Sequence, residues 1–507
     1  MAIFNKAQHK FTTKNFQIGA PEAEAETTAK SKIKLSDVFE DYLSILPELE
    51  TEKFIVIGRK GSGKTAIGEH LYFRSLNKPN EFCEFVRKID IDIQQIVQIG
   101  IEKGNEIQKE LLFKWIILTK LLKLISNNEA VQCLKGIKEL KEFIKRNSGF
   151  VDIRSFELKE IITQNGFEVK VDYLNRVMAK FNKDVRFKGE RASFVKLLPH
   201  LEEIVIDILA SDEDADNNYI IVFDDLDIGF KSENPDHLDT LVNLIRICKD
   251  YNNNLFGKKA TNAKVILLLR DDIARHLKEN DSDTAKIFSS YSIQISWYEH
   301  SLFKIDENLI NLKKFINKRI ERNFIANRIP LFSGKGHWSS LVEEDSIYYK
   351  DSSFKYVLEH TFYKPRDIIL FFKPLSDFQF EIPLKPDNIK TLLGKYSLEA
   401  IEEIKNELLL VYNIKEIKAI INALEALANL NCFKYQDLIE KLSTFIPDRK
   451  PEDIIEQLFQ YSLIGNKETG SKMVYFKYRE ERSDEIRIDK EKEFILPYIL
   501  KIYFKNK

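Results

Sequence analysis

Short apolar segments that end in glycine or in polar residues recur along the first three hundred residues. Phe54–Ile57, Tyr219–Phe223 and residues 263–269 are almost continuously apolar, and Phe82–Ile93 and Ser292–Trp297 also have strand patterns. Strands that are apolar throughout are typical of parallel sheets with helices on both faces. The pattern therefore predicts an α/β fold built on a parallel sheet.

Apolar residues at intervals of three and four predict helices in the rest of the chain. The predicted segments are 35–49, 105–126, 129–146, 190–210, 236–251, 302–324, 353–372, 413–429, 434–444 and 450–461. Gly166–Val171 has the pattern of one strand of a small hairpin. The most apolar helical segment, Leu111–Ile125, contains three lysines and is predicted to be a buried helix, not a membrane span.

The last three helices precede two short strand patterns, Ser462–Gly465 and Met473–Tyr478, around a polar turn. This order predicts a winged helix, a module that often places its third helix in the DNA major groove. Here the third helix and its lead-in carry four acidic residues, Asp448, Glu452, Asp453 and Glu456, against two basic ones, Arg449 and Lys450. An acidic face repels phosphates, so protein contact is favoured over DNA contact.

These patterns divide the chain into five predicted parts. They are a lead-in segment (1–50), an α/β core that carries the predicted sheet (51–103 and 216–300), a helical insertion (104–215), a helical lid (301–395) and a winged-helix domain (396–507). The insertion contains a lysine-rich segment, Leu134–Arg146. A solvated helix face is the favoured interpretation of that segment, and a phosphate-backbone patch is the alternative.

Composition changes this picture little. The formal net charge of the 507-residue chain is −1, so no global field attracts it to nucleic acid or to an anionic membrane. The four cysteines are far apart and lack metal-ligand spacing, which indicates a reduced, cytoplasmic chain. The first residues have no apolar core of a signal peptide.

The strand at 54–57 leads into Gly58–Thr65, which matches the pattern G-x-x-x-x-G-K-[ST], and a helical segment follows. Glycines let successive backbone N–H groups converge on phosphate oxygens, and the helix start adds its positive dipole end. Lys64 is expected to neutralise the β- and γ-phosphates, and the Thr65 hydroxyl to bind Mg²⁺. A plain surface turn is the alternative, which the strand and helix disfavour. The predicted nucleotide-binding residues are Gly58, Arg59, Lys60, Gly61, Ser62, Gly63, Lys64, Thr65 and Ala66.

Acidic residues end the predicted strand 219–223. We assign Asp224 to the metal ion and Asp225 to positioning of the attacking water, because a strand that ends in acids supplies the second half of an NTPase site. Asp227 is a further candidate whose alternative role is to cap the following turn.

Two arginines are predicted to sense the γ-phosphate. Arg270 ends the strand 263–269, and Arg366 follows Pro365 at a predicted helix start. The structural alternatives are ion pairs of Arg270 with Asp271 or Asp272 and of Arg366 with Asp367.

Taken together, these segments resemble prokaryotic P-loop ATPases of the STAND/AAA+ type. The resemblance rests on the loop Gly58–Thr65, the acidic strand end, Lys364–Asp367 within Tyr356–Asp367, the lead-in Ala23–Glu26 and Trp297 after the last strand. It covers most of the chain except the helical insertion. It implies an ATPase with bound ATP and Mg²⁺, and members of such families are often associated with defence against phage.

Two departures from that pattern matter. The second acid is Asp225, where fast AAA+ ATPases usually have glutamate, which favours slow turnover. No arginine finger for a neighbouring subunit is evident, and Arg246, Arg319 and Arg322 are only candidates. Missing Leu-Ser-Gly-Gly-Gln and Asn-Lys-x-Asp motifs disfavour a transporter ATPase and a GTPase.

The sequence therefore predicts a regulatory ATPase whose nucleotide state controls self-assembly or a partner protein. The alternative is a DNA-associated, origin-recognition-like ATPase that uses the winged helix and the lysine-rich insertion. Nucleic acid is thus a disfavoured partner, and no membrane partner is expected.

Overall fold

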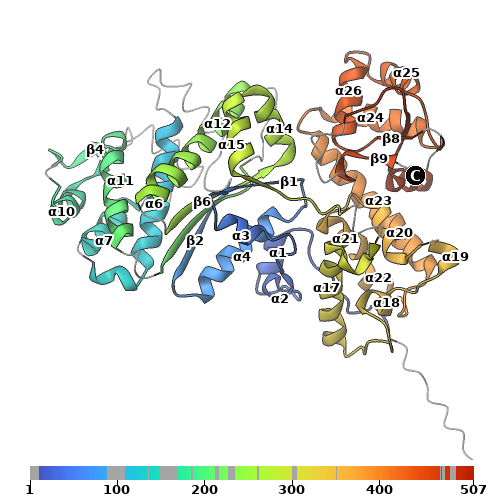
Figure 1. The fold of residues 1–507 in the computed structure, drawn as a ribbon, viewed down its shortest axis with the longest axis horizontal. Helices are drawn as coiled ribbons and strands as arrows, with labels where there is room; N and C mark the ends of the chain where they lie inside the picture. The colour runs from blue at the N-terminus through green and yellow to red at the C-terminus, as the bar shows by residue number, and fades with distance from the viewer. Residues whose placement is uncertain are drawn as a thin grey trace, which may run out of the picture. The chain divides into compact units, whose positions relative to one another are not determined.

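The computed structural model describes most of the chain. The described residues are 11–87, 109–134, 136–148, 168–183, 186–211, 216–226, 234–259, 262–299, 305–349, 351–468, 470, 474–479 and 487–507. The chain forms two compact units (Figure 1). The sheet unit comprises Ser44–Arg59 and Lys64–Ile295, and the helical unit comprises Met1–Leu43, Lys60–Gly63 and Ser296–Lys507.

A five-stranded parallel sheet forms the centre of the sheet unit. Its strands lie in the order β2-β5-β6-β1-β7. Their bounds are β1 Ile55–Gly58, β2 Glu81–Val86, β5 Asn218–Phe223, β6 Ala263–Arg270 and β7 Ser292–Gln294. All five predicted strands are present, which confirms the parallel-sheet α/β core. Residues 88–93 of the strand predicted at Phe82–Ile93 lie outside the described residues.

Helices cover both faces of this sheet. After β1, helix α4 (Lys64–Asn77) contacts β1, β2 and β6. From β1 the chain crosses to β2 at one edge of the sheet, and it then adds β5, β6 and β7 in the opposite direction across the sheet. Because the crossovers are right-handed, this reversal places the later helices on the other face (Figure 1). These helices are α6 (Lys109–Asn127), α12 (Pro235–Asp250) and α14 (Asp271–Asn280). Almost all of the apolar residues of α6 are buried, as predicted for a buried helix.

The rest of the predicted insertion packs beside α6. Its elements are η1 Ala130–Cys133, α7 Ile137–Arg146, β3 Glu168–Lys170, α10 Asp172–Lys180, β4 Arg191–Ser193 and α11 Phe194–Ser211. β3 pairs with β4 in an antiparallel arrangement, which confirms a strand within Gly166–Val171, but α10 lies between the two strands in the chain, so they do not form the predicted small hairpin. Helix α7 buries its apolar residues and exposes Lys138, Lys141 and Lys145, as a solvated helix face does. Further along the sheet unit lie η3 Tyr251–Phe256, α13 Gly257–Lys259 and α15 Ser282–Tyr291.

The predicted helix over residues 35–49 is wrong, because two short helices take its place. They are α2 (Leu35–Val38) and α3 (Ile45–Leu49). The boundary between the two units follows Leu43, so α2 belongs to the helical unit and α3 to the sheet unit. Ser44 has a φ of 53°, which a continuous right-handed helix cannot contain. Each helix therefore buries its apolar residues in a different unit, although the spacing continues across both.

The helical unit is built on one continuous hydrophobic cluster. Its helices are α1 Ala23–Thr27, α2, η4 Glu307–Leu309, α17 Asn311–Asn327, α18 His337–Leu341, α19 Ser346–Tyr349, α20 Ser353–Glu359, α21 Pro365–Phe372, α22 Leu375–Phe378, α23 Pro386–Leu408, α24 Ile414–Leu427, α25 Tyr435–Phe445, α26 Pro451–Gln460, η5 Lys477–Arg479 and α27 Tyr498–Asn506. Helix α23 packs against α21 and α27 and runs across residue 395 without a break. The boundary predicted at that residue therefore falls inside a helix.

The C-terminal helices have the predicted order. Helices α24, α25 and α26 are followed by β8 (Gly465–Lys467) and β9 (Val474–Tyr475), which pair as an antiparallel hairpin. A third strand, β10 (Glu493–Ile495), pairs with β8 and was not predicted. A helical C-terminal region is thus confirmed, and its designation as a winged helix stays a prediction.

A buried ion pair attaches the N-terminal segment to α17. Glu26 Oε1 and Oε2 accept from Arg319 Nη1 at 2.6 Å and Nη2 at 2.9 Å, and Arg319 Nη1 also donates to the Ile18 carbonyl at 2.9 Å. The side chains of Glu26 and Arg319 are 2% and 4% exposed. Gly19, with φ of 147°, leaves room for this pair, because a Cβ there would lie 2.1 Å from Arg319 Nη1. Arg319 is therefore buried inside its own chain, which argues against a role as an arginine finger.

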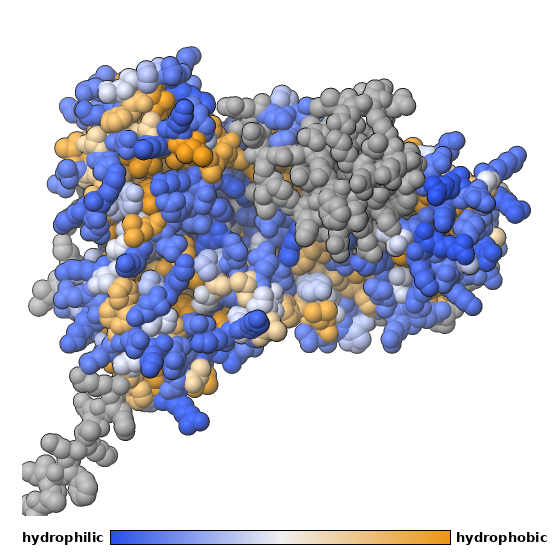
Figure 2. Space-filling view, turned by 180° about the vertical axis from the view of Figure 1, so that it is seen from behind, coloured by the Kyte–Doolittle hydropathy of each residue, from blue (hydrophilic) through white to orange (hydrophobic). Residues whose placement is uncertain are grey.

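Hydrophilic residues predominate on the face shown in Figure 2, and hydrophobic residues form separate patches on it. Among the described helices, none combines the length and the apolar composition that a membrane span requires.

Candidate functional site

The predicted phosphate loop connects β1 to α4. Gly61 and Gly63 have φ values of 80° and 99°, which favour glycine, so the motif glycines stand where the turn requires them. Helix α4 begins at Lys64, and its first backbone N–H groups lack partners within the helix. Arg59 ends the sheet unit's part of the loop, and Ala66 lies in the first turn of α4.

Lys64 is folded back onto its own loop. Its Nζ donates to the carbonyl oxygens of Gly58 at 2.8 Å and Arg59 at 3.2 Å, and the residue is only 9% exposed. The ammonium group is thus held between two backbone oxygens at the end of β1.

Asp224 follows β5 and is almost completely buried, at 2% exposure. Its Oδ1 accepts the backbone N–H of Asp225 at 3.0 Å, whereas Oδ2 is buried and accepts no hydrogen bond from any described residue. Burial and the neighbouring charge of Asp225 raise the pKa of Asp224 to about 7, against the opposing hydrogen bond from Thr65 and the charges of Lys64 and Arg87.

This environment fits a magnesium ion. A buried carboxylate oxygen without a partner and a threonine hydroxyl beside it are the hard oxygen ligands that Mg²⁺ prefers. Thr65 and Asp224, the two predicted metal ligands, are close enough for their hydrogen bond to lower the pKa of the aspartate. We therefore name these two residues as the ones that would hold the ion.

Asp225 adopts a left-handed backbone conformation with a φ of 55° and is partly exposed. Non-glycine residues with such φ values are uncommon and are concentrated at functional sites. Asp227, the further acidic candidate, lies outside the described residues.

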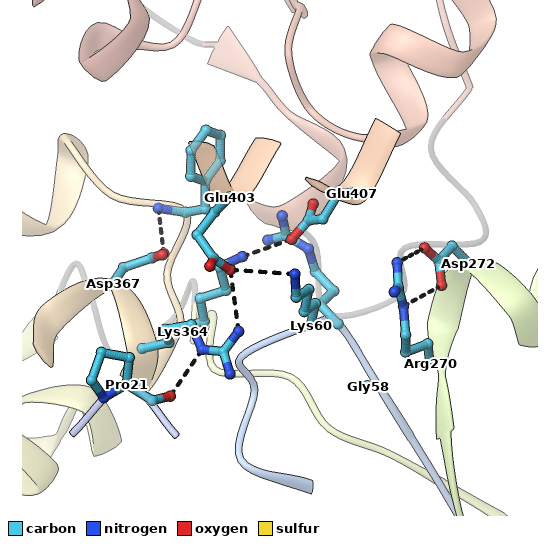
Figure 3. Close-up of polar contacts among 12 residues, drawn as sticks. Pro21, Gly58, Lys60, Arg270, Asp272, Lys364, Asp367, Glu403 and Glu407 are labelled. Atoms are coloured by element: carbon cyan, nitrogen blue, oxygen red, sulfur yellow. Dashed lines mark hydrogen bonds and ion pairs between the residues drawn. The ribbon is translucent and has the colours of Figure 1, made fainter. Parts of the chain in front are cut away.

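Arg270 ends β6, opposite Gly58 in the sheet register. Strand β6 lies between β1 and β5, so the loop, Arg270 and Asp224 all follow the carboxyl ends of adjacent parallel strands. The Arg270 guanidinium binds both oxygens of Asp272, with Nε to Oδ1 at 3.1 Å and Nη2 to Oδ2 at 2.5 Å (Figure 3). The ion pair that the sequence left open is thus present, and a role for Arg270 in sensing phosphate stays a prediction.

The tip of the loop, Lys60–Gly63, belongs to the helical unit. The Trp297 indole N–H donates to the Ser62 carbonyl at 2.8 Å, and the Arg366 backbone N–H donates to the Gly61 carbonyl at 3.4 Å. In a trans peptide the C=O and the following N–H point in opposite directions. Holding these two carbonyls therefore turns the N–H groups of Ser62 and Gly63 away from Trp297 and Arg366.

The side chain of Arg366 lies along the same loop. A Cβ on Gly61 would come within 2.8 Å of Arg366 Cβ and 3.0 Å of its Cδ. The guanidinium donates from Nε to the Pro21 carbonyl at 2.9 Å and from Nη1 to Glu403 Oε2 at 3.1 Å. Asp367, the partner considered from sequence, accepts the Phe362 N–H at 2.9 Å (Figure 3).

Two acidic residues of α23 that bind cations at and near the loop were not predicted from the sequence. Glu403 lies 3.8 Å from Lys60 Nζ and binds Arg366, and Glu407, one turn further along, binds Lys364 at 3.1 Å. The spacing of four residues between the glutamates is the only signal in the sequence, and it is common on helices. The position of Trp297 at the loop was likewise not predicted, although its place after the last strand was noted.

Comparisons with known proteins add three findings. Residues 310–405 match a family described as the FunZ-associated C-terminal helical domain, a range that contains α21 and most of α23. The chain is 24% identical over 364 residues to the putative transposon gamma-delta 80.3 kDa protein of Escherichia coli (strain K12). This match covers 68% of the chain and only 45% of the length of that relative.

Two solved structures also resemble the chain, each at 12% identity. One is a Walker-type ATPase of Pyrococcus abyssi, with a TM-score of 0.39 and coverage of 95% of this chain and 99% of that one. The other is Cdc6p of Pyrobaculum aerophilum, with a TM-score of 0.28 and coverage of 96% and 98%. These scores are low, so the P-loop NTPase fold rests on the sheet order and the loop of this chain itself.

The buried carboxylate predicts a pH-dependent gain in stability for Asp224→Asn. A folded-state pKa of about 7 lies above the ordinary value of about 3.9, so the natural chain loses stability as the pH rises from about 4 to 7. In magnesium-free buffer at pH 8, Asp224→Asn should unfold at a higher temperature than the natural chain, and the difference should shrink as the pH falls toward 4. Asp216→Asn is the matched control, because Asp216 is exposed at the opposite end of β5. Equal behaviour of both variants in thermal unfolding would contradict the expectation.

Proposed function

We propose that this protein binds ATP with Mg²⁺, hydrolyses it slowly to ADP and phosphate, and uses its nucleotide state to control self-assembly or a partner protein. A role of this switch in defence against phage is part of the proposal and rests on the family resemblance alone. The observation that carries the nucleotide site is the combination of Lys64, folded into the glycine loop, with the unsatisfied buried oxygen of Asp224.

Two details of the loop support an anionic ligand. The N–H groups of Ser62 and Gly63 face away from Arg366 and Trp297, which bind their neighbouring carbonyls, and the Ser62 Oγ is buried without a hydrogen-bond partner among the described residues. Backbone N–H groups that converge in a glycine loop bind phosphate oxygens. When bound, Mg²⁺ neutralises negative charge on those oxygens. Lys64 supplies the matching positive charge from the protein.

We assign the orientation of a water molecule to Asp225. It directly follows Asp224, the residue that would bind the metal ion, and it has a left-handed backbone conformation. Aspartate is one methylene shorter than the glutamate of fast AAA+ ATPases, and this shorter reach supports slow hydrolysis. A nucleotide that persists between binding and hydrolysis suits a switch better than it suits a motor.

The DNA-associated alternative has less support. The exposed residues of α26 include Glu452, Asp453 and Glu456, which would repel the phosphate backbone. The exposed lysines of α7 are the one observation in favour of it. A mobility shift with duplex DNA that weakens with salt would establish this alternative.

Lys64→Ala is expected to weaken ATP binding by at least about tenfold, because one charge-assisted interaction is worth about 1.5–3 kcal/mol. The fold should persist, since the hydrogen bonds of Lys64 Nζ to the carbonyl oxygens of Gly58 and Arg59 lie within its own loop. Isothermal titration calorimetry measures the affinity, and Lys53→Ala, before β1, is the control. Equal ATP affinity of Lys64→Ala and the natural chain would refute the proposed site.

Asp225→Asn should keep ATP affinity and lose hydrolysis by about a hundredfold or more, the usual contribution of a positioned acid–base group. Asparagine tolerates the left-handed conformation at this position, so the backbone should not change. Phosphate release under single-turnover conditions measures the rate. Hydrolysis at the natural rate would assign the water-positioning role to another residue, with Asp227 the next candidate.

The regulatory part of the proposal predicts a change in assembly. Size-exclusion chromatography with light scattering should give different molar masses for the natural chain in ATP·Mg²⁺ and in ADP·Mg²⁺, without added DNA. A partner-directed switch would instead show its nucleotide dependence in binding to that partner. Identical masses in both nucleotides would remove self-assembly from the proposal.

A further inference from the structure

We propose that Glu403 determines how strongly the site prefers a nucleoside triphosphate over a diphosphate. Its carboxylate holds the two cations beside the loop tip, Lys60 and Arg366, until a terminal phosphate replaces it. This role rests on the proposed function and adds to it a residue that no sequence motif marks.

A single carboxylate oxygen serves both cations. Glu403 Oε2 accepts from Arg366 Nη1 at 3.1 Å and lies 3.8 Å from Lys60 Nζ (Figure 3). The three side chains are between 16% and 28% exposed, so the group is neither sealed in a core nor fully hydrated. An ion pair in such a setting can exchange one partner for another without a large desolvation cost.

The geometry limits which part of Arg366 can move. Its Cβ and Cδ lie against Gly61, and its backbone N–H donates to the Gly61 carbonyl, so the base of the side chain is fixed to the loop. Among the described residues, the guanidinium donates hydrogen bonds to the Pro21 carbonyl and to Glu403. For Arg366 to exchange its hydrogen bond with Glu403 for one with a phosphate oxygen, only the guanidinium end of its side chain therefore has to rotate.

The charges explain why the carboxylate affects nucleotide choice. Lys60 and Arg366 carry two positive charges, and Glu403 cancels one of them. The nearby pair Lys364–Glu407 is buried and neutral overall, and it leaves this balance unchanged. A third phosphate brings further negative charge and can displace the carboxylate, whereas a diphosphate lacks the group that would do so.

Glu403→Gln provides the test, because it removes the charge and keeps the shape. The affinities for ATP·Mg²⁺ and ADP·Mg²⁺ are measured by calorimetric titration. Glu403→Gln should bind ATP about tenfold more tightly than the natural chain does, which corresponds to one charge-assisted hydrogen bond. Its affinity for ADP should be nearly unchanged. Glu399→Gln is the matched control, since Glu399 lies on the same helix and pairs with Lys373 at 2.8 Å. That control should leave both affinities as they are.

The same substitution in an Arg366→Ala background separates this role from a purely structural one. There the gain in ATP affinity should become clearly smaller, because Lys60 is then the one cation of the pair that the glutamate still neutralises. An equal change for ATP and ADP, or a gain of undiminished size in the Arg366→Ala background, would overturn the role of Glu403. A natural chain that binds neither nucleotide would refute the proposed function as well, whereas normal binding with an unchanged ATP-to-ADP ratio in Glu403→Gln would refute the Glu403 role only.

Discussion

The orientation of two peptide groups at the loop tip is the constraint on which the account depends. The carbonyls of Gly61 and Ser62 accept hydrogen bonds from the Arg366 backbone and the Trp297 indole, so the next N–H groups point the other way. A glycine loop binds phosphate only if such N–H groups converge, and free glycine backbones sample many conformations. The helical unit thus fixes the direction in which these two N–H groups point, as the proposed phosphate site requires.

A second constraint is the burial of Asp224, which lacks a partner for one oxygen. Burying an unpaired carboxylate costs stability and raises its pKa, here to about 7. The hydrogen bond from Thr65 and the positive charge of Lys64 offset only part of that cost. A cation bound at this oxygen would recover the rest, which is why the proposed site assigns the metal ion to Asp224. Functional sites commonly keep such locally unfavourable groups.

The sequence predicted the parts that depend on local pattern. Each apolar segment assigned to the sheet is a strand, and two of the loop glycines, Gly61 and Gly63, have positive φ values that favour glycine. The predicted helix over 35–49 failed because apolar spacing cannot show that its two halves pack in different units. Glu403 and Trp297 were missed as loop contacts for a related reason. Both residues lie hundreds of positions after the loop in the sequence and meet it only through tertiary packing. Local periodicity predicts helices and strands but does not predict which distant residues come into contact.

Hydrogen–deuterium exchange of the natural chain tests most directly whether the helical unit responds to the nucleotide at the loop. The account predicts that ATP·Mg²⁺ changes the exchange of peptides from the loop and also of those that cover α21 and α23. AMP should leave these helices unchanged, because it lacks the phosphates that reach the loop tip. Changes confined to the loop, or equal changes with AMP and ATP, would contradict the account.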